Sequence, residues 1–348
     1  MIKRKILSSV TAMFAVMLLM LFLIYEEKSS LAVTSSLSLC ALRVIPALFP
    51  YMVISSVIVS LDLLEPICRH IPTERIFALP RASASVILTG LLCGFPVGAA
   101  GACRLYESGK LTKNEAERLI VFSSGASPAF LCGTVAFLWD SKKYGIFLLI
   151  SQTVLSVICG MVLSKIGNKD INTGHDKENI KKEISFPAAL CKAVSDAASA
   201  SLSLTAYVTF FRVISVIVSS VLQHIYLPIS AIAEFSFGCV SGASIGGYTG
   251  AFICGFAIGF SGLSVFMQIY NIAAKSFLNI KYYLPVKTLC GIILGFLSCS
   301  FFKVFPMNPS CKTSTAFSAV PLGNIIILYA VLFFICALTQ MQRKKPHS

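Results

Sequence analysis

Apolar residues gather into long runs along this chain, and short polar segments separate the runs. Crossing the hydrocarbon core of a membrane takes about 20 apolar residues, and windows of that length predict about eight membrane-spanning helices. These helices are expected near residues 6–24, 31–61, 118–138, 144–165, 188–222, 250–272, 284–302 and 320–341. The pattern therefore predicts an all-α polytopic membrane protein.

Two shorter apolar segments, 85–101 and 229–248, contain runs of small residues that would interrupt a helix. Lipid cannot satisfy the backbone groups that such breaks leave unpaired, so these segments must pack within protein or line a polar cavity. We expect both to be re-entrant, entering and leaving the membrane on the same side. A second break follows each of them, at 122–128 and at 259–262. Matching interruptions in two halves of a chain are typical of a transporter binding site.

The positions of Lys and Arg support this topology. If both termini are cytoplasmic and both short segments are re-entrant, most basic residues fall on the cytoplasmic side, as the positive-inside rule requires. That cytoplasmic set includes Lys275, Lys281 and Lys287. The basic residues left outside are Lys28, Lys142, Lys143, Lys303 and Lys312. The two short segments then enter from opposite sides, which predicts two inverted repeats.

A short sequence echo agrees with such repeats, because Val53-Ile-Ser-Ser-Val-Ile-Val59 resembles Val213-Ile-Ser-Val-Ile-Val218. The first apolar run is interpreted as a retained anchor because no small-x-small cleavage site follows it. The predicted parts are an N-terminal signal-anchor helix (1–30), a first repeat (31–167), a polar cytoplasmic linker (168–185), a second repeat (186–302) and a C-terminal loop, helix and basic tail (303–348).

The composition supports the membrane assignment and limits the partners. Hydrophobic residues make up 56% of the 348 residues and charged residues 13%, whereas soluble domains have roughly 25% charged residues. The mean hydropathy is +0.82. The formal net charge of +14 comes from basic residues scattered among loops, so we expect a lipid bilayer and not nucleic acid as partner. The 13 cysteines form no C-x-x-C pair, and we expect no structural disulfide, no metal site and no cofactor.

Charged residues within apolar segments are functional candidates, because polar atoms are costly at membrane depth. Glu234 opens the second short segment between apolar residues. It is a candidate coupling site for a proton or sodium ion, a substrate acceptor, or a partner of Arg212. Arg212 is expected to pair with Glu234 or with an anionic substrate. Arg43, in the matching part of the first half, either joins the site or extends toward the outer interface.

Small residues at the breaks complete the expected substrate-binding site. Half-helix N-termini carry partial positive charge and bind carboxylates, and nearby hydroxyls offer hydrogen bonds. Close helix packing remains the alternative role for any single small residue. The residues assigned to the site are Gly94, Pro96, Gly98, Ser124, Gly125, Ser127, Ser236, Gly238, Ser241, Gly242 and Ser244. Asp196 and Gln268 are weaker candidates for lining the same cavity.

Sequence support for catalysis is slight. Gly242-Ala-Ser-Ile-Gly246 matches the G-x-S-x-G nucleophile motif, but that motif needs a strand–turn–helix context and a His base. The 4 histidines lie in loops or at the end of the chain, and the sequence contains no Walker loop and no H-E-x-x-H motif. We therefore do not expect an enzyme.

Three segments together resemble a known family. They are Cys93–Gly101 (CGFPVGAAG), Glu115–Leu119 (EAERL) and Phe122–Phe130 (FSSGASPAF), and they are similar to sporulation integral membrane proteins of the YlbJ type. Those proteins carry the nucleoside recognition (Gate) domain, which is shared with concentrative nucleoside transporters. Glu234–Gly238 (EFSFG) resembles the family's E-x-T-x-G segment, with Ser in place of Thr. The resemblance covers nearly the whole chain and is strongest over residues 42–135.

The resemblance implies a transporter that acts in endospore formation and exports dipicolinate from the mother cell across the outer forespore membrane. Dipicolinate is a small aromatic dianion, which arginine side chains, serine hydroxyls and helix N-termini are chemically suited to bind. One alternative is a transporter of nucleosides or another small solute. The other is a membrane scaffold for spore cortex or envelope assembly that transports nothing. The coupling ion, the direction of transport and the formation of a homo-oligomer stay open.

Overall fold

The computed structural model describes residues 2–61, 63–68, 70–166, 185–221, 226–307 and 309. Throughout this described part of the chain the regular structure is helical, which confirms the all-α prediction. The predicted helix 320–341 and the linker up to residue 184 lie outside the described residues.

The helices are α1 (Ile2–Ile24), α2 (Glu26–Leu39), α3 (Ile45–Ser60), α4 (Glu65–Cys68), α5 (Thr73–Phe77), α6 (Ser83–Cys93), α7 (Val97–Glu107), α8 (Lys113–Phe122), α9 (Ala136–Leu138), α10 (Lys142–Ile166), α11 (Phe186–Val221), α12 (Tyr226–Ala233), α13 (Phe235–Ile245), α14 (Gly247–Phe260), α15 (Gly262–Lys275) and α16 (Tyr283–Val304). Two π-helical stretches, η1 (Cys40–Val44) and η2 (Phe130–Val135), precede α3 and α9.

Within the described residues, 4 helical segments are long and apolar enough to cross a membrane. These segments are Lys142–Lys165, Phe186–Val221, Gly247–Lys275 and Tyr283–Val304. The number rises to 5 if Ser9–Ile24 and Glu26–Leu42, which are bent by 90° relative to each other, form one span. The expected span 118–138 is instead two helical pieces, because the small residues after Phe122 interrupt α8 before η2 begins.

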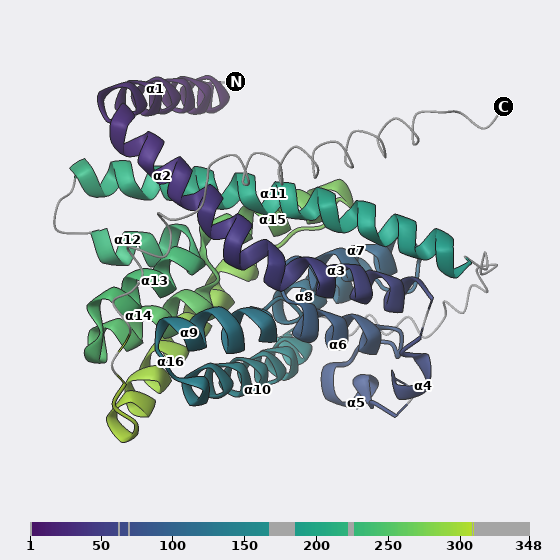
Figure 1. The fold of residues 1–348 in the computed structure, drawn as a ribbon. Coiled ribbons are helices and arrows are strands. Elements are labelled where there is room, and N and C mark those ends of the chain that lie inside the picture. The colour runs from purple at the N-terminus through teal and green to yellow at the C-terminus, as the bar shows by residue number, and fades with distance from the viewer. Residues whose placement is uncertain are drawn as a thin grey trace.

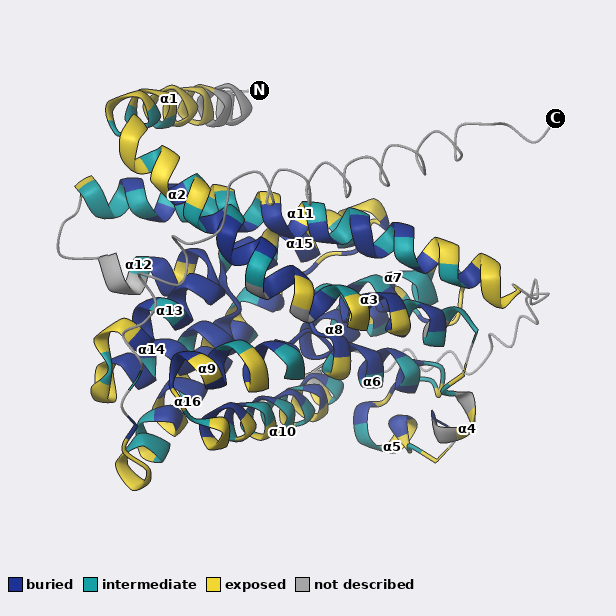
Figure 2. Ribbon diagram, in the orientation of Figure 1, coloured by how far each residue is buried: buried dark blue, intermediate teal, exposed yellow. Residues whose placement is uncertain are grey.

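The helices form two packed groups. In Figure 1, α11 runs along one side of the molecule with α2 and α3 beside it. These three helices share a buried apolar cluster that also includes Phe237 of α13. A larger cluster joins α6 to α10 with α13 to α16. Figure 2 shows that buried positions concentrate where these groups face each other, whereas α1 is largely exposed.

Helices α6 and α7 form a hairpin, and α13 and α14 form another. The helix before each turn has 11 residues, and the turn begins at a glycine. Gly94 has φ 75° and ψ −163°, and Gly246 has φ 67° and ψ −168°. This backbone region is open essentially to glycine alone. The two hairpins therefore reverse direction through the same backbone conformation.

Glycines also allow the two arms of each hairpin to approach closely. A Cβ placed on Gly90 would lie 3.1 Å from the Cα of Gly98. In the second hairpin, a Cβ placed on Gly250 would lie 2.2 Å from the carbonyl oxygen of Gly242. In each pair, one glycine lies four residues before the turn glycine and the other lies four residues after it. The hairpins thus share one glycine register.

Candidate functional site

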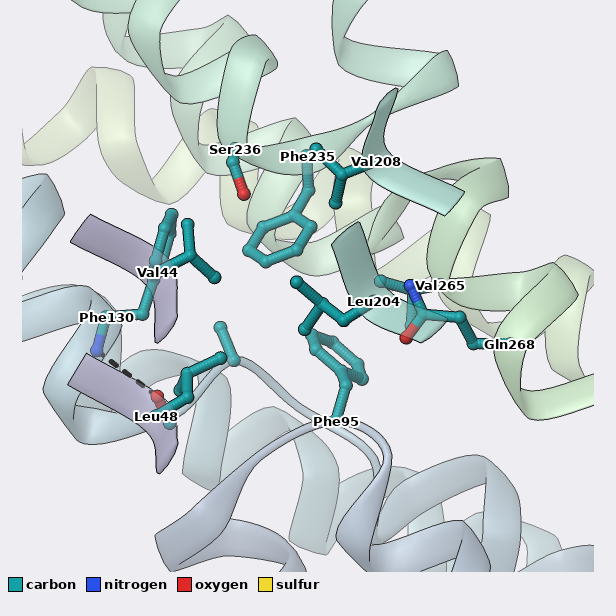
Figure 3. A pocket seen from close by; sticks show the side chains of 12 residues that line it. Val44, Leu48, Phe95, Phe130, Leu204, Val208, Phe235, Ser236, Val265 and Gln268 are labelled. Carbon is teal, nitrogen blue, oxygen red and sulfur yellow. Dashed lines mark hydrogen bonds between the residues drawn. The ribbon is translucent and has the colours of Figure 1, made fainter. Parts of the chain in front are cut away.

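A small cavity lies where the two helical groups meet the first hairpin turn and α13 (Figure 3). Its volume is about 20 Å³, which is room for about one water molecule. Most of the wall is apolar, and Ser127, Ser236 and Gln268 contribute polar side chains. The residues that line the cavity are Val44, Leu48, Phe95, Ala126, Ser127, Phe130, Leu204, Val208, Phe235, Ser236, Val265 and Gln268.

Equivalent positions of the two halves supply part of this wall. Val44 and Leu48 come from η1 and α3, and Leu204 and Val208 come from α11. Val44 lies 160 positions before Leu204, and Leu48 lies 160 positions before Val208. The echo between Val53 and Val213 has the same offset. The two similar sequence segments therefore lie in α3 and α11, and both of these helices face the cavity.

The interruption at residues 122–128, called the first break from here on, joins α8 to η2 and is held by groups from distant segments. The side chain of Gln152 on α10 accepts a hydrogen bond from the Ala126 N–H at 3.0 Å and donates one to the Ala126 carbonyl at 2.9 Å. The N–H of Phe95, at the turn of the first hairpin, donates to the carbonyl of Gly125 at 2.9 Å. Ser127 accepts a hydrogen bond from the N–H of Phe130 at 3.2 Å. Backbone groups that the break exposes thus find partners inside the protein.

The carbonyl of Ser123 packs against the first hairpin. Cβ atoms added to Gly90 and Gly98 would lie 2.2 Å and 2.1 Å from this oxygen. The neighbouring Ser124 donates its hydroxyl hydrogen to the carbonyl of Ile120 at 2.8 Å. Its own carbonyl accepts a hydrogen bond from the side chain of Lys287. The two serines therefore connect α8, the first hairpin and α16.

Lys287, which the charge count assigns to the cytoplasmic side, lies in α16 with only 6% of its surface exposed. Its Nζ lies 5.9 Å from the ring centre of Phe95 and 5.6 Å from that of Tyr283. The sequence feature that could have indicated its burial is the place of Lys287 one turn into an apolar helix. Gln152 was also missed, since a single glutamine in a spanning helix carries no distinctive pattern.

Glu234 separates α12 from α13 and is 1% exposed. Its Oε2 accepts a hydrogen bond from the N–H of Phe237 at 2.8 Å and so caps the N-terminus of α13. No described group donates a hydrogen bond to the other carboxylate oxygen, Oε1. The hydroxyl of Ser236 is likewise without a hydrogen-bond partner among the described residues. Figure 3 shows this hydroxyl directed into the cavity.

Arg212 on α11 lies close to the same helix end. Its Cζ is 4.1 Å from the ring centre of Phe237, and it is near enough to Glu234 for the two charges to interact. The structure therefore brings the predicted pair together at the start of α13. Arg43 lies in η1, but its side chain is outside the described part.

Other predicted site residues take part in helix packing. A Cβ on Gly238 would lie 2.7 Å from both the Cα of Ala231 and the Cβ of Ala257, and Gly242 faces α14. Ser241 receives a hydrogen bond from Ser230 at 3.1 Å. The exposed Ser244 donates to the carbonyl of Val240 on its own helix at 2.9 Å. Gly94 and Pro96 form the turn of the first hairpin. Substrate contacts by these residues stay predictions.

No group of three or more His, Cys, Asp or Glu side chains is placed to hold a metal ion within the part of the chain that the structure describes. The site brings together a buried carboxylate, the buried Lys287, the partly buried Arg212, hydroxyls and the backbone groups of the breaks. Such a set binds and neutralises charge.

The chain is similar to a protein of Bacillus subtilis (strain 168) named "Sporulation integral membrane protein YlbJ". The two are 24% identical over 397 aligned positions, which cover 96% of this chain and 95% of the relative. The resemblance found at the sequence motifs is thereby confirmed over nearly the whole length. No family model matches the chain, and no solved structure matches it.

Proposed function

We propose that this protein is a membrane transporter of a small organic anion, and that it exports dipicolinate from the mother cell toward the forespore. The observation that carries the proposal is the cavity where the first break, the start of α13 and α15 converge. Interrupted helices that meet at one cavity are typical of transporter binding sites. The name of the relative supports a role in sporulation. In this proposal the substrate crosses unchanged, and the protein is not an enzyme.

The proposed architecture is about eight spanning helices and two re-entrant hairpins in two inverted Gate-type repeats. The shared glycine register of the hairpins and the paired cavity residues of α3 and α11 support it. Both termini are cytoplasmic in this proposal, and the protein lies in the outer forespore membrane. A cavity of about 20 Å³ is far too small for dipicolinate. The described conformation is therefore a closed one, and the anion enters when the repeats separate.

The charges near the cavity suit an anion. Arg212 lies 4.1 Å from the ring centre of Phe237 at the start of α13, and Lys287 lies 5.9 Å from the ring centre of Phe95, which lines the cavity. Ser127, Ser236 and Gln268 supply hydrogen bonds to carboxylate oxygens. In this scheme Glu234 orients Arg212 or carries a coupling proton on Oε1.

The test is uptake of labelled dipicolinate by liposomes that contain the purified protein. We expect saturable uptake by the wild type, and a loss of at least tenfold in Arg212→Ala, because removing a charge-assisted pair costs about 1.5–3 kcal/mol. Arg81→Ala is the matched control, since Arg81 is 70% exposed and pairs only with the surface residue Glu74. Its uptake should equal that of the wild type.

Three results would count against the proposal. Folded wild-type protein without saturable dipicolinate uptake contradicts it outright. Competition by nucleosides but not by dicarboxylates would favour a nucleoside transporter. Normal spore formation by Arg212→Ala and Glu234→Gln, together with failure of a packing change at Gly94, would favour a scaffold that transports nothing.

A further inference from the structure

A lysine buried in an apolar helix needs compensation for its charge. Lys287 is 6% exposed, and α16 is one of the segments apolar enough to span a membrane. An ammonium ion at such a place is costly unless polar groups surround it. Because the side chain is covered on all sides, it does not extend to water as lysines near helix ends commonly do.

A backbone group at the first break compensates the charge of Lys287. The side chain of Lys287 donates a hydrogen bond to the carbonyl of Ser124, just after the C-terminal end of α8. Carbonyls at a helix C-terminus carry partial negative charge. The normal helical donor to this carbonyl would be the N–H of residue 128, which is a proline and has none. The faces of Phe95 and Tyr283 offer further attraction for a cation.

In membrane transporters, unwound carbonyls and half-helix C-termini are the groups that coordinate a coupling sodium ion. The ammonium group of Lys287 meets that kind of carbonyl at the first break. The titratable side chains that lie near it are Cys290 on its own helix, Cys159 on α10 and Tyr283. No carboxylate is among these groups.

We propose that Lys287 is a tethered cation that occupies the ion site of the first break, so that this break binds no exchangeable sodium ion. The lysine belongs to the second half of the chain and the break to the first, a separation of 163 residues. The tethered charge therefore also fastens α16 to the first half. The inference concerns an ion site and stands whatever substrate the cavity accepts.

The first experiment measures thermal unfolding of the purified full-length protein in detergent, without any substrate. Wild-type protein and Glu234→Gln should each melt at the same temperature in sodium chloride and in choline chloride of equal ionic strength. Lys287→Ala should melt several degrees lower in both salts. Thr288→Ala is the matched control, because its hydroxyl is exposed and bonds only within α16. It should melt like the wild type.

The second experiment restores the charge chemically. Propylammonium chloride should restore at least half of the decrease in melting temperature that Lys287→Ala causes. The free cation fits the vacated space beside the Ser124 carbonyl. It should have no effect on Lys287→Met, in which a side chain of similar length fills that space without charge. Lys287→Arg keeps a cation and should be the least destabilised of the three variants.

Selective stabilisation by sodium of both the wild type and Glu234→Gln would overturn the proposal, since it would reveal an exchangeable sodium site that does not depend on Glu234. So would a Lys287→Met variant as stable as the wild type, or a Lys287→Ala variant that propylammonium does not restore. If the alanine variant does not fold, the comparison of the arginine and methionine variants and the salt comparison of the wild type and Glu234→Gln decide the question. None of these results depends on dipicolinate, so failure here is distinct from failure of the transport proposal.

Discussion

The side-chain amide of Gln152 makes two hydrogen bonds with the backbone of Ala126, at 3.0 and 2.9 Å. The glutamine is 6% exposed and belongs to α10, 26 residues after its partner. It acts as a substitute for the helical bonds that the first break lacks. The break is therefore a fixed structural element, held open by a neighbouring helix.

Replacing Gln152 by Leu should destabilise the protein strongly. The change leaves a buried N–H and a buried carbonyl of Ala126 unpaired, at about 1–3 kcal/mol for each group. Thermal unfolding in detergent measures the loss. Ser164→Ala on the same helix is the control, because its hydroxyl bonds only to the carbonyl of Met161. Equal stability of Gln152→Leu and the wild type would show that the two bonds do not hold the break.

Replacing Gly98 by Ala should separate the first hairpin from the first break. The new Cβ would lie 2.1 Å from the carbonyl oxygen of Ser123, and overpacking of this kind costs typically about 1–3 kcal/mol. Gly133→Ala is the matched control, since nothing lies within 4 Å of the added Cβ. We expect a lower melting temperature for Gly98→Ala alone. A similar drop in both variants would indicate a general effect of alanine.

Two substitutions at Glu234 should distinguish its capping role from its charge. Glu234→Gln keeps an oxygen that accepts from the N–H of Phe237, so the variant should remain folded while dipicolinate uptake falls. Glu234→Ala also loses the helix cap, at about 1 kcal/mol. Melting temperature and liposome uptake are measured for both. Full uptake by Glu234→Gln would show that the residue serves only as a cap.

Replacing Ser236 by Ala should weaken substrate binding without affecting stability. Its hydroxyl lines the cavity and has no partner among the described residues. Loss of one hydrogen bond to the substrate is worth about 0.5–1.5 kcal/mol, or roughly a two- to tenfold increase in the KM for uptake. Ser300→Ala serves as control because Ser300 is exposed and its hydroxyl bonds within α16. Equal KM values for the two variants would exclude a contact between Ser236 and the substrate.

Helical character and the positions of the breaks followed from the sequence, because both depend on local properties. Apolar runs predict spanning helices, and the described spans at α10, α11 and α16 lie within a few residues of the expected ranges. The interruption inside 118–138 shows the limit of hydropathy, since a window average passes over six small residues that end a helix. The resemblance to YlbJ was also readable from short motifs.

The sequence by itself determined that the backbone breaks at Gly94, Gly246 and before Pro128, because glycine and proline act on their own dihedral angles and hydrogen bonds. Only the tertiary structure decided what satisfies the first break. Gln152 and Lys287 reach it from 26 and 163 residues away, and no local pattern encodes such a distance. Lys287 is a buried cation because helix packing, and not hydropathy, decides which side chain meets an unpaired carbonyl.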